Sequence, residues 1–169
     1  MTLLVKVAVK EDFCALRAMK SDHEAIRWSG FSAAPDPKNR TWFDEMLSDP
    51  NKRVFIGFID QEPVAYAQFT WEDDTDRFGI SYGVAENHRE RGHGAEVLKK
   101  AMEQMTAETG GRGRGYEAWI AEDNIASKKA VKNAGFSQRP AVREDTFHYP
   151  TECKKTMQLW VKECGRSGK

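Results

Sequence analysis

The stretch "AENHRERGHGAEVLKK", residues 85–100, is the most informative part of the sequence, because it places two glycines and a cluster of charges between an apolar segment and the start of a helix. Upstream, "RFGISYGV" (77–84) alternates large apolar residues with small ones, the period-two pattern of a strand. Downstream, apolar residues recur at helical spacing until Gly110 and Gly111 end the run. A strand, a glycine turn and a helix therefore follow one another. At a helix N-terminus, unpaired backbone N–H groups and the positive end of the macrodipole favour an anion.

The glycine turn has the composition of a phosphate-binding loop. Gly92 and Gly94 lack a β-carbon, so a diphosphate can approach the backbone, and Arg89 and Arg91 add positive charge. The alternative is a helix start with exposed basic residues that binds no ligand, and the spacing alone does not separate the two. A Walker loop is excluded, because no G-x-x-x-x-G-K-[ST] string occurs. A dinucleotide fingerprint is excluded too, because Val97 stands where its third glycine is needed.

The composition predicts one globular domain over residues 1–164, followed by a flexible tail over 165–169. The chain has 169 residues, of which 40% are hydrophobic, and 26 basic residues balance 26 acidic ones. This zero net charge gives no chain-wide footprint for nucleic acid or membrane. The short apolar run at the N-terminus, broken by Lys6 and Lys10, predicts neither a signal peptide nor a spanning helix. The odd number of cysteines without CxxC spacing favours a reduced, cytoplasmic protein that binds no metal, and Cys14 is expected to be buried.

The rest of the chain alternates between strand and helix patterns. Strands are predicted at 3–9, 53–59, 64–71, 77–84, 116–121 and 155–161, and helices at 11–20, 40–49, between Gly94 and Gly110, and at 125–134. The order indicates a mixed α/β sheet with at least one right-handed β-α-β unit joining parallel strands. The long polar loop "RWSGFSAAPDP" (27–37) is expected to be a mobile lid.

Two motifs carry a family resemblance. The loop reads R-x-x-G-x-G from Arg89 to Gly94, and "EDNIASKKAVKNAGF" (122–136) follows the next strand. Together they resemble the acetyl-coenzyme A loop and the N-x-x-S…G-F helix of the GCN5-related N-acetyltransferases (GNAT), over nearly the whole chain. The resemblance implies the GNAT fold: an α/β (α+β), mixed and mostly antiparallel sheet of six or seven strands with about four helices. It also implies an acyl-coenzyme A cleft between two splayed parallel central strands.

The same resemblance implies acetyl-coenzyme A as the cosubstrate, without a metal, and a set of binding residues. Backbone amides of the loop would bind the pyrophosphate, and the loop consists of Arg89, Glu90, Arg91, Gly92, His93, Gly94 and Ala95. The strand end Gly83, Val84 and Ala85 would pair with the pantetheine. Asn124 would contact the same arm, with Ser127 and Lys128 lining the cleft. Taken alone, Asn124 is instead the cap of the following helix, and Ser127 is a residue of its first turn.

The catalytic residues depart from the family pattern at one position. Many members place a tyrosine seven residues after the asparagine, where this chain has Val131. Ser127 is the candidate donor to the departing sulfur. Glu72, in the acidic segment 72–76, is the candidate base, although such a segment is also typical of a solvated turn. Tyr82 either faces the acceptor or belongs to the core.

The resemblance implies direct attack of a primary amine on acetyl-coenzyme A in a ternary complex, most simply a small-molecule amine. Its closest branches acetylate amino-sugar nucleotides or the N-termini of ribosomal proteins. A non-catalytic acyl-coenzyme A sensor stays open, and so does a homodimer. A nucleic-acid module using Arg112 and Arg114 conflicts with the zero net charge. Trp28, Phe31, Trp42 and Phe43 belong either to the acceptor wall or to the core, and His88 and His93 are expected to be exposed loop residues.

Overall fold

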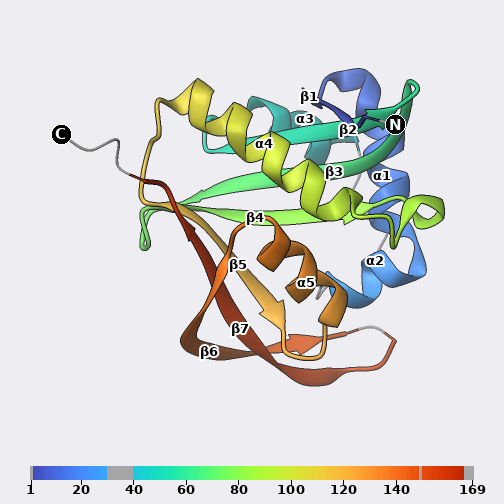
Figure 1. Ribbon diagram of the computed structural model, residues 1–169. Coiled ribbons are helices and arrows are strands. Elements are labelled where there is room, and N and C mark those ends of the chain that lie inside the picture. The colour runs from blue at the N-terminus through green and yellow to red at the C-terminus, as the bar shows by residue number, and fades with distance from the viewer. Residues whose placement is uncertain (1, 30–39, 149, 166–169) are drawn as a thin grey trace.

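The computed structural model describes residues 2–29, 40–148 and 150–165. These residues form one seven-stranded sheet in the order β1-β2-β3-β4-β5-β7-β6, with five α-helices (Figure 1). The strands are β1 (Leu4–Val7), β2 (Lys52–Ile59), β3 (Glu62–Glu72), β4 (Arg77–Val84), β5 (Gly115–Ala121), β6 (Ser137–Phe147) and β7 (Cys153–Glu163). The helices are α1 (Phe13–Ser21), α2 (His23–Trp28), α3 (Arg40–Ser48), α4 (His93–Thr109) and α5 (Ile125–Asn133), with short 3-10 turns η1 (Lys10–Asp12) and η3 (Glu86–His88).

Every strand pair in the sheet is antiparallel except β4 with β5, so the predicted mixed and mostly antiparallel sheet is confirmed. The β2–β3 hairpin turns at Asp60 and Gln61, whose positive φ angles of 47° and 68° belong to a turn that follows the strand twist. No helix in the described part of the chain is both long and apolar enough to cross a membrane.

The two central strands separate soon after they meet. The parallel pairing of β4 with β5 consists of Phe78 opposite Tyr116 and Gly79 opposite Glu117. Both strands then continue, to Val84 and to Ala121, without further pairing. Figure 1 shows them diverging from this point. The separation leaves one edge of β4 without a neighbouring strand, so a groove opens through the middle of the sheet.

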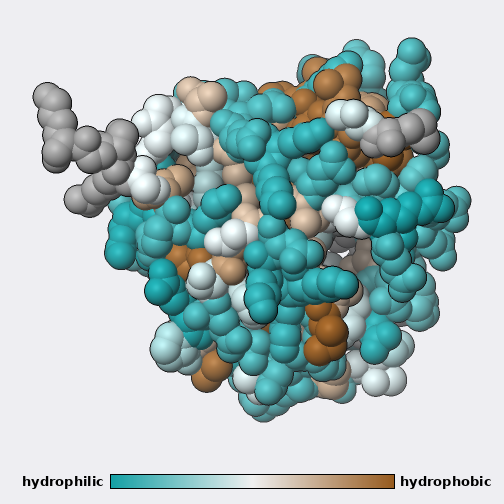
Figure 2. Space-filling model, in the orientation of Figure 1, coloured by the Kyte–Doolittle hydropathy of each residue, from teal (hydrophilic) through white to brown (hydrophobic). Residues whose placement is uncertain are grey.

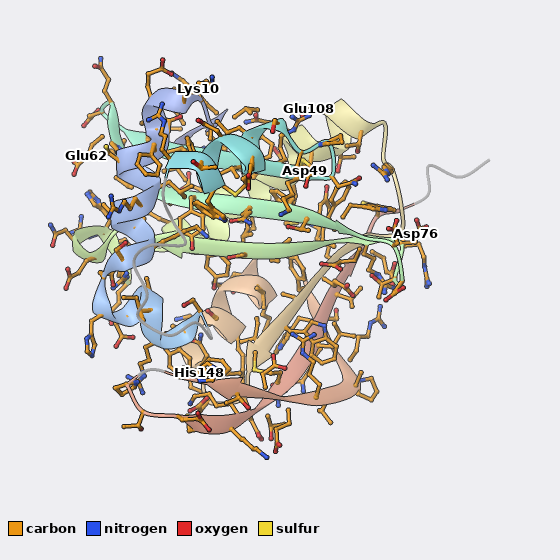
Figure 3. The ribbon with its side chains drawn as sticks, turned by 180° about the vertical axis from the view of Figure 1, so that it is seen from behind. Lys10, Asp49, Glu62, Asp76, Glu108 and His148 are labelled. Carbon is orange, nitrogen blue, oxygen red and sulfur yellow. The ribbon has the colours of Figure 1, made fainter. Side chains whose placement is uncertain are left out.

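Helices cover both faces of the sheet and bury two clusters of core residues. Figures 1 and 3 show α4 and α5 on one face and α1 and α3 on the other. The period-two alternation of β2 feeds both clusters, because Phe55 faces α4 while Val54 and Ile56 face α1 and α3. The larger cluster packs residues of α4 and α5, such as Leu98 and Val131, against the sheet. The core thus fixes the first turns of α4 and α5 relative to the gap between β4 and β5.

Two elements were not predicted from the sequence, α2 and β6. Helix α2 has no buried residue, so it carries no apolar periodicity, and it begins because the Asp22 carboxylate accepts a hydrogen bond from Ala25 N at 3.2 Å. Strand β6 is an edge strand, exposed over nearly all its length, with a register shift between Gln138 and Val142 that accommodates Pro140. Edge strands tolerate charge, proline and bulges, and these features hide them from pattern recognition.

Several smaller expectations can be compared with the structure. The prediction that Cys14 is buried was wrong, because its helix turns that side chain to solvent. Phe43 is a fully buried core residue. The predicted lid, Phe31 within it and the tail lie largely outside the described residues. Figure 2 shows hydrophobic atoms gathered at the top of one face in the region of β1, where Leu4 and Val9 are about half exposed (54% and 53%).

Candidate functional site

The glycine turn joins β4 to α4, and its two glycines serve different purposes. Gly92 is the N-cap of α4 with φ of 82°, and a β-carbon there would meet no atom within 4 Å. The positive φ therefore explains this glycine. At Gly94 the backbone is ordinary, but a β-carbon would lie 3.0 Å from Cε2 of Tyr82. Gly94 thus allows the Tyr82 ring to pack directly against the first turn of α4.

The Arg89 side chain is held by the protein. Its Nε donates to the Val84 carbonyl at 3.1 Å, and its Nη2 donates to Oδ2 of Asp22 at 2.6 Å. Asp22 uses its other oxygen to cap α2 through Ala25 N. One guanidinium therefore connects the end of β4, the glycine turn and the start of α2, and both partners are mostly buried.

A cavity of about 1400 Å³ opens where β4 and β5 separate. It runs from the glycine turn and the first turns of α4 and α5, past the diverging strands, to α1, α2 and β6 on the other side. Ten of the residues predicted to bind the cofactor line it: Gly83, Val84, Arg89, Glu90, Gly92, His93, Gly94, Ala95, Asn124 and Ser127. Ala85, Arg91 and Lys128 do not line it. The Lys128 ammonium donates to the Glu122 carbonyl at 2.9 Å, and the neighbouring Lys129 lines the cavity instead.

The free edge of β4 presents backbone groups to this cavity. Ala85 N donates to the Val64 carbonyl at 2.8 Å, so Ala85 pairs with β3. Because successive residues of a strand direct their N–H and C=O groups to opposite sides, the backbone groups of Val84 and Tyr82 face the gap. The Val84 carbonyl is already bound by Arg89, which leaves its N–H on the open side.

On the opposite wall, the first turn of α5 is organised by Asn124. This residue is 9% exposed and is the N-cap of the helix, because its Oδ1 accepts a hydrogen bond from Ser127 N at 3.2 Å. Asn124 therefore has the capping role, and its side chain also lines the cavity. Ser127 provides only its backbone to the cap, so its hydroxyl is a separate group beside the cavity.

A tyrosine does lie at this wall, but it comes from β4. Tyr82 Oη donates to the Ser127 carbonyl at 3.5 Å, and burial raises the pKa of Tyr82 to about 12. Val131, at the family's tyrosine position, is fully buried in the larger core cluster and does not line the cavity. The sequence could not show that Tyr82 and Ser127 meet, because 45 positions separate them.

Glu72 lies outside the residues that line the cavity, near the start of β4. A β-carbon added at Gly79 would lie 3.1 Å from Glu72 Oε1, so the Glu72 carboxylate lies directly above Gly79 on one face of β4. Burial raises the pKa of Glu72, and the negative charges of Glu117 and Asp74 raise it further. Figure 3 shows the following turn, marked by Asp76, at the opposite end of the strands from Glu62.

The wall on the α1 and α2 side contains residues that sequence reasoning did not identify. The Tyr66 ring fills the space beside Gly83, where a β-carbon would lie 2.5 Å from Tyr66 Cε1. Lys20 Nζ lies 4.7 Å from the centre of that ring and donates to Gln68 Oε1 at 3.1 Å. Trp28 also lines the cavity, whereas Trp42 packs against the smaller core cluster. These residues come from distant segments, and only the fold brings them together.

His88 and His93 are less exposed than expected, with side-chain exposures of 16% and 11%, because the glycine turn folds both rings toward the cavity. His88 Nε2 lies 3.3 Å from Glu62 Oε1. Within the described ranges, no group of three or more histidine, cysteine or acidic residues is arranged to hold a metal ion.

Comparisons with known proteins agree with this architecture. A search of the curated proteins found no match. Among solved structures, an N-acetyltransferase from Staphylococcus aureus Mu50 is similar, with a TM-score of 0.78, 16% identity and coverage of 96% of this chain and 99% of that one. A ribosomal-protein-alanine N-acetyltransferase from Brucella melitensis has a TM-score of 0.76 and 19% identity over 95% and 99%.

A spermidine N-acetyltransferase from Vibrio cholerae, solved with CoA and spermine, has a TM-score of 0.77 and 10% identity over 94% of each chain. At these identities the likeness concerns the fold. The family model described as Acetyltransferase (GNAT) family matches residues 17–136, most of the chain. The chain therefore belongs to the GNAT family of acetyltransferases, enzymes that transfer an acetyl group from acetyl-coenzyme A to an amine.

Proposed function

We propose that the protein acetylates a primary amine by direct attack on acetyl-coenzyme A, with both substrates bound together. The observation that carries this proposal is the single cavity of about 1400 Å³. It joins the glycine turn on one side of the sheet to the α1 and α2 wall on the other, through the gap between β4 and β5. A donor entering from one side and an acceptor from the other would meet without a covalent enzyme intermediate. The free cysteines fit a reduced compartment such as the cytoplasm.

Coenzyme A would bind with its diphosphate at the first turn of α4. Gly92, His93, Gly94 and Ala95 line the cavity there, at the N-terminus of a 17-residue helix whose unpaired N–H groups favour an anion. Arg89 and Glu90 border the same end, and Arg91 contributes charge from outside the cavity. The ion pair with Asp22 fixes the Arg89 side chain beside the turn, so this part of the wall is in place before the ligand arrives.

The pantetheine arm would lie along the free edge of β4, as an added strand. The backbone groups of Tyr82 and Val84 face the gap, with Gly83 and Ala85 completing the strand end. On the other side the arm would pass Asn124 and the first turn of α5, with Lys128 beyond the rim. A backbone N–H on this edge of β4 would stabilise the oxyanion that forms when the amine attacks the thioester.

The departing thiolate would meet two O–H donors at the α5 wall, the Ser127 hydroxyl and the Tyr82 phenol. A thiol with a pKa of about 8.5 is a tolerable leaving group, so a hydrogen bond that strengthens as charge develops is sufficient. Tyr82 stays protonated at neutral pH, because burial raises its pKa to about 12. It thereby provides the phenol that Val131 cannot.

The acceptor ammonium must lose a proton before it attacks. Glu72 would accept that proton through water, because its carboxylate lies over Gly79, two residues or about 7 Å along β4 from Ser81 at the cavity. The raised pKa of Glu72 is closer to neutral pH than that of an ordinary carboxyl group, and a general base is most effective when its pKa lies near the working pH.

The acceptor would be a small-molecule amine, either an amino-sugar nucleotide or another small amine, with a protein N-terminus as the alternative. The test is release of coenzyme A thiol across a panel of amines, with calorimetry of coenzyme A binding alongside. Acetyl transfer with intersecting initial-rate patterns is expected. A ping-pong pattern, or an acetyl group trapped on Cys14, Cys153 or Cys164, would contradict direct attack. Binding of coenzyme A without turnover of any amine would favour the non-catalytic sensor.

A further inference from the structure

We infer that the acceptor carries an aromatic or apolar group close to its primary amine, and that this group packs against Trp28 and Trp119. This inference rests on the proposed function, because it concerns the acceptor half of the same cavity. That half is lined by α1, α2, β5 and β6, on the side of the sheet away from α4.

The register of the sheet places Trp119 beside the reaction centre. Gly79 of β4 pairs with Glu117 of β5, so two residues further along, Ser81 and Trp119 lie level on the same face. Both residues line the cavity. An amine that approaches the gap between the strands from this face must pass over the Trp119 side chain, because the strands have already separated at that level.

Trp119 packs against a small apolar cluster on this side of the cavity. Trp28 and Trp119 pack against a small cluster formed by Ala121, Phe147 and Met157, all five of which line the cavity. Phe147 and Met157 are 2% and 7% exposed, so the cluster is tightly packed and forms a rigid part of the cavity wall. The Trp28 indole is oriented by its Nε1, which donates to Glu24 Oε2 at 3.1 Å. Aromatic side chains held in this way give large contact area to a planar or apolar group.

The charges on this half of the cavity do not favour a polycation. The lining charges are two bases, Lys20 and Arg143, and two acids, Glu24 and Asp145. The Asp145 carboxylate lies 3.1 Å from Arg143 Nη2, and Glu24 lies 3.5 Å from Arg27. An excess of negative charge, which would concentrate a polyamine, is therefore absent from these lining residues.

The aromatic rings themselves are covered in part by cations. The Arg143 guanidinium lies 4.4 Å from the Trp119 ring centre. Two cations lie near the Trp28 ring centre, the Arg27 guanidinium at 4.8 Å and Lys155 Nζ at 5.1 Å. Lys155 is paired with Asp123 at 2.7 Å. Because these protein cations already occupy ring faces, the rings are better suited to an apolar group of the acceptor than to its ammonium. The ammonium would be deprotonated at the gap, beyond the rings.

The test is a thiol-release panel with phenethylamine, spermidine and glucosamine as acceptors. We expect kcat/KM for phenethylamine to exceed that for the other two at least tenfold. Two tetrapeptides, one beginning with phenylalanine and one with serine, test whether the acceptor that carries the aromatic group is a small molecule or a protein N-terminus. Preference for the phenylalanine peptide over phenethylamine supports the inference with a protein acceptor, and the reverse order supports it with a small one. Equal or better kcat/KM for spermidine or glucosamine overturns it.

Variants of Trp119 test the wall itself. Trp119→Leu is expected to raise the KM for phenethylamine at least tenfold and leave the Kd for coenzyme A unchanged, while Trp119→Phe retains most of the preference. Trp71→Leu is the matched control, because Trp71 also lies against an arginine, with Arg112 at 4.0 Å, but does not line the cavity. An unchanged KM in folded Trp119→Leu, or an equal change in Trp71→Leu, overturns the inference. If coenzyme A binds but no amine is turned over, the proposed function fails, and the inference fails with it.

Discussion

The Tyr82→Phe substitution tests whether the Tyr82 hydroxyl acts in catalysis or whether the residue only packs its ring against Gly94. It removes only Oη and keeps the ring that lies against Gly94. The hydroxyl makes a 3.5 Å contact with the Ser127 carbonyl, at the outer limit of a hydrogen bond, so its loss should cost at most ~0.5 kcal/mol of unfolding free energy. If the phenol instead hydrogen-bonds the departing thiolate, kcat should fall by ~100-fold, or ~2.7 kcal/mol of transition-state stabilisation.

The assay is steady-state thiol release with a saturating amine, combined with urea denaturation. The KM for acetyl-coenzyme A should change little, because the interaction strengthens only as charge develops on sulfur. Since the pKa of Tyr82 is raised to about 12, the variant and the parent should differ by the same factor at every pH from 6 to 9. Ser127→Ala, measured in parallel, shows which of the two hydroxyls provides more of the effect.

Tyr116→Phe is the control for the loss of a buried phenol. Tyr116 Oη donates to the Met102 carbonyl at 3.1 Å and lies 3.0 Å from Thr106 Oγ1, and the residue does not line the cavity. Its removal should cost ~1–2 kcal/mol of stability and leave kcat unchanged. A kcat of Tyr82→Phe within about twofold of the parent would contradict a catalytic role for the phenol, and so would an equal loss of kcat in Tyr116→Phe.

Three further substitutions test other parts of the site. Gly94→Val should displace the Tyr82 ring and weaken coenzyme A binding at least tenfold, ~1.4 kcal/mol, and calorimetry that shows unchanged affinity in a folded variant would contradict this. Asp22→Asn keeps an oxygen to cap α2 but loses the 2.6 Å ion pair with Arg89, so urea denaturation should show a loss of ~1–3 kcal/mol, and an unchanged midpoint would mean that the pair adds no net stability. Burial raises the pKa of both Tyr66 and Tyr82 from 10.0 to about 12, so the folded state disfavours their ionisation. The stability that this difference contributes is fully present below pH 10 and should be lost as the pH rises toward 12. Tyr66→Phe should flatten this decline in Tm, and an identical slope in the variant would show that Tyr66 does not cause it.

The elements whose sequence signals are local could be predicted without the structure. The period-two pattern of residues 77–84, the glycine turn and the helical spacing up to Gly110 predicted β4 and α4 correctly, because backbone conformation there depends on neighbouring residues. The strand–helix–strand order also predicted that β4 and β5 are parallel, whereas the splay of the two strands was implied by the family resemblance. Ten of the residues that the family resemblance implied for cofactor binding line one cavity.

Features that depend on contacts between distant segments became visible only in the folded chain. Edge strand β6 carries no apolar periodicity because it has a neighbouring strand on one side alone and is mostly exposed. Helix α2 carries none because it buries no residue. The contact of Tyr82 with Ser127 requires β4 and α5 to meet, and the burial of Val131 depends on how α5 rotates against the core. The position of Trp119 beside the gap, opposite Ser81, is set by the register between β4 and β5, because a shift of one residue would turn that side chain to the opposite face of the sheet.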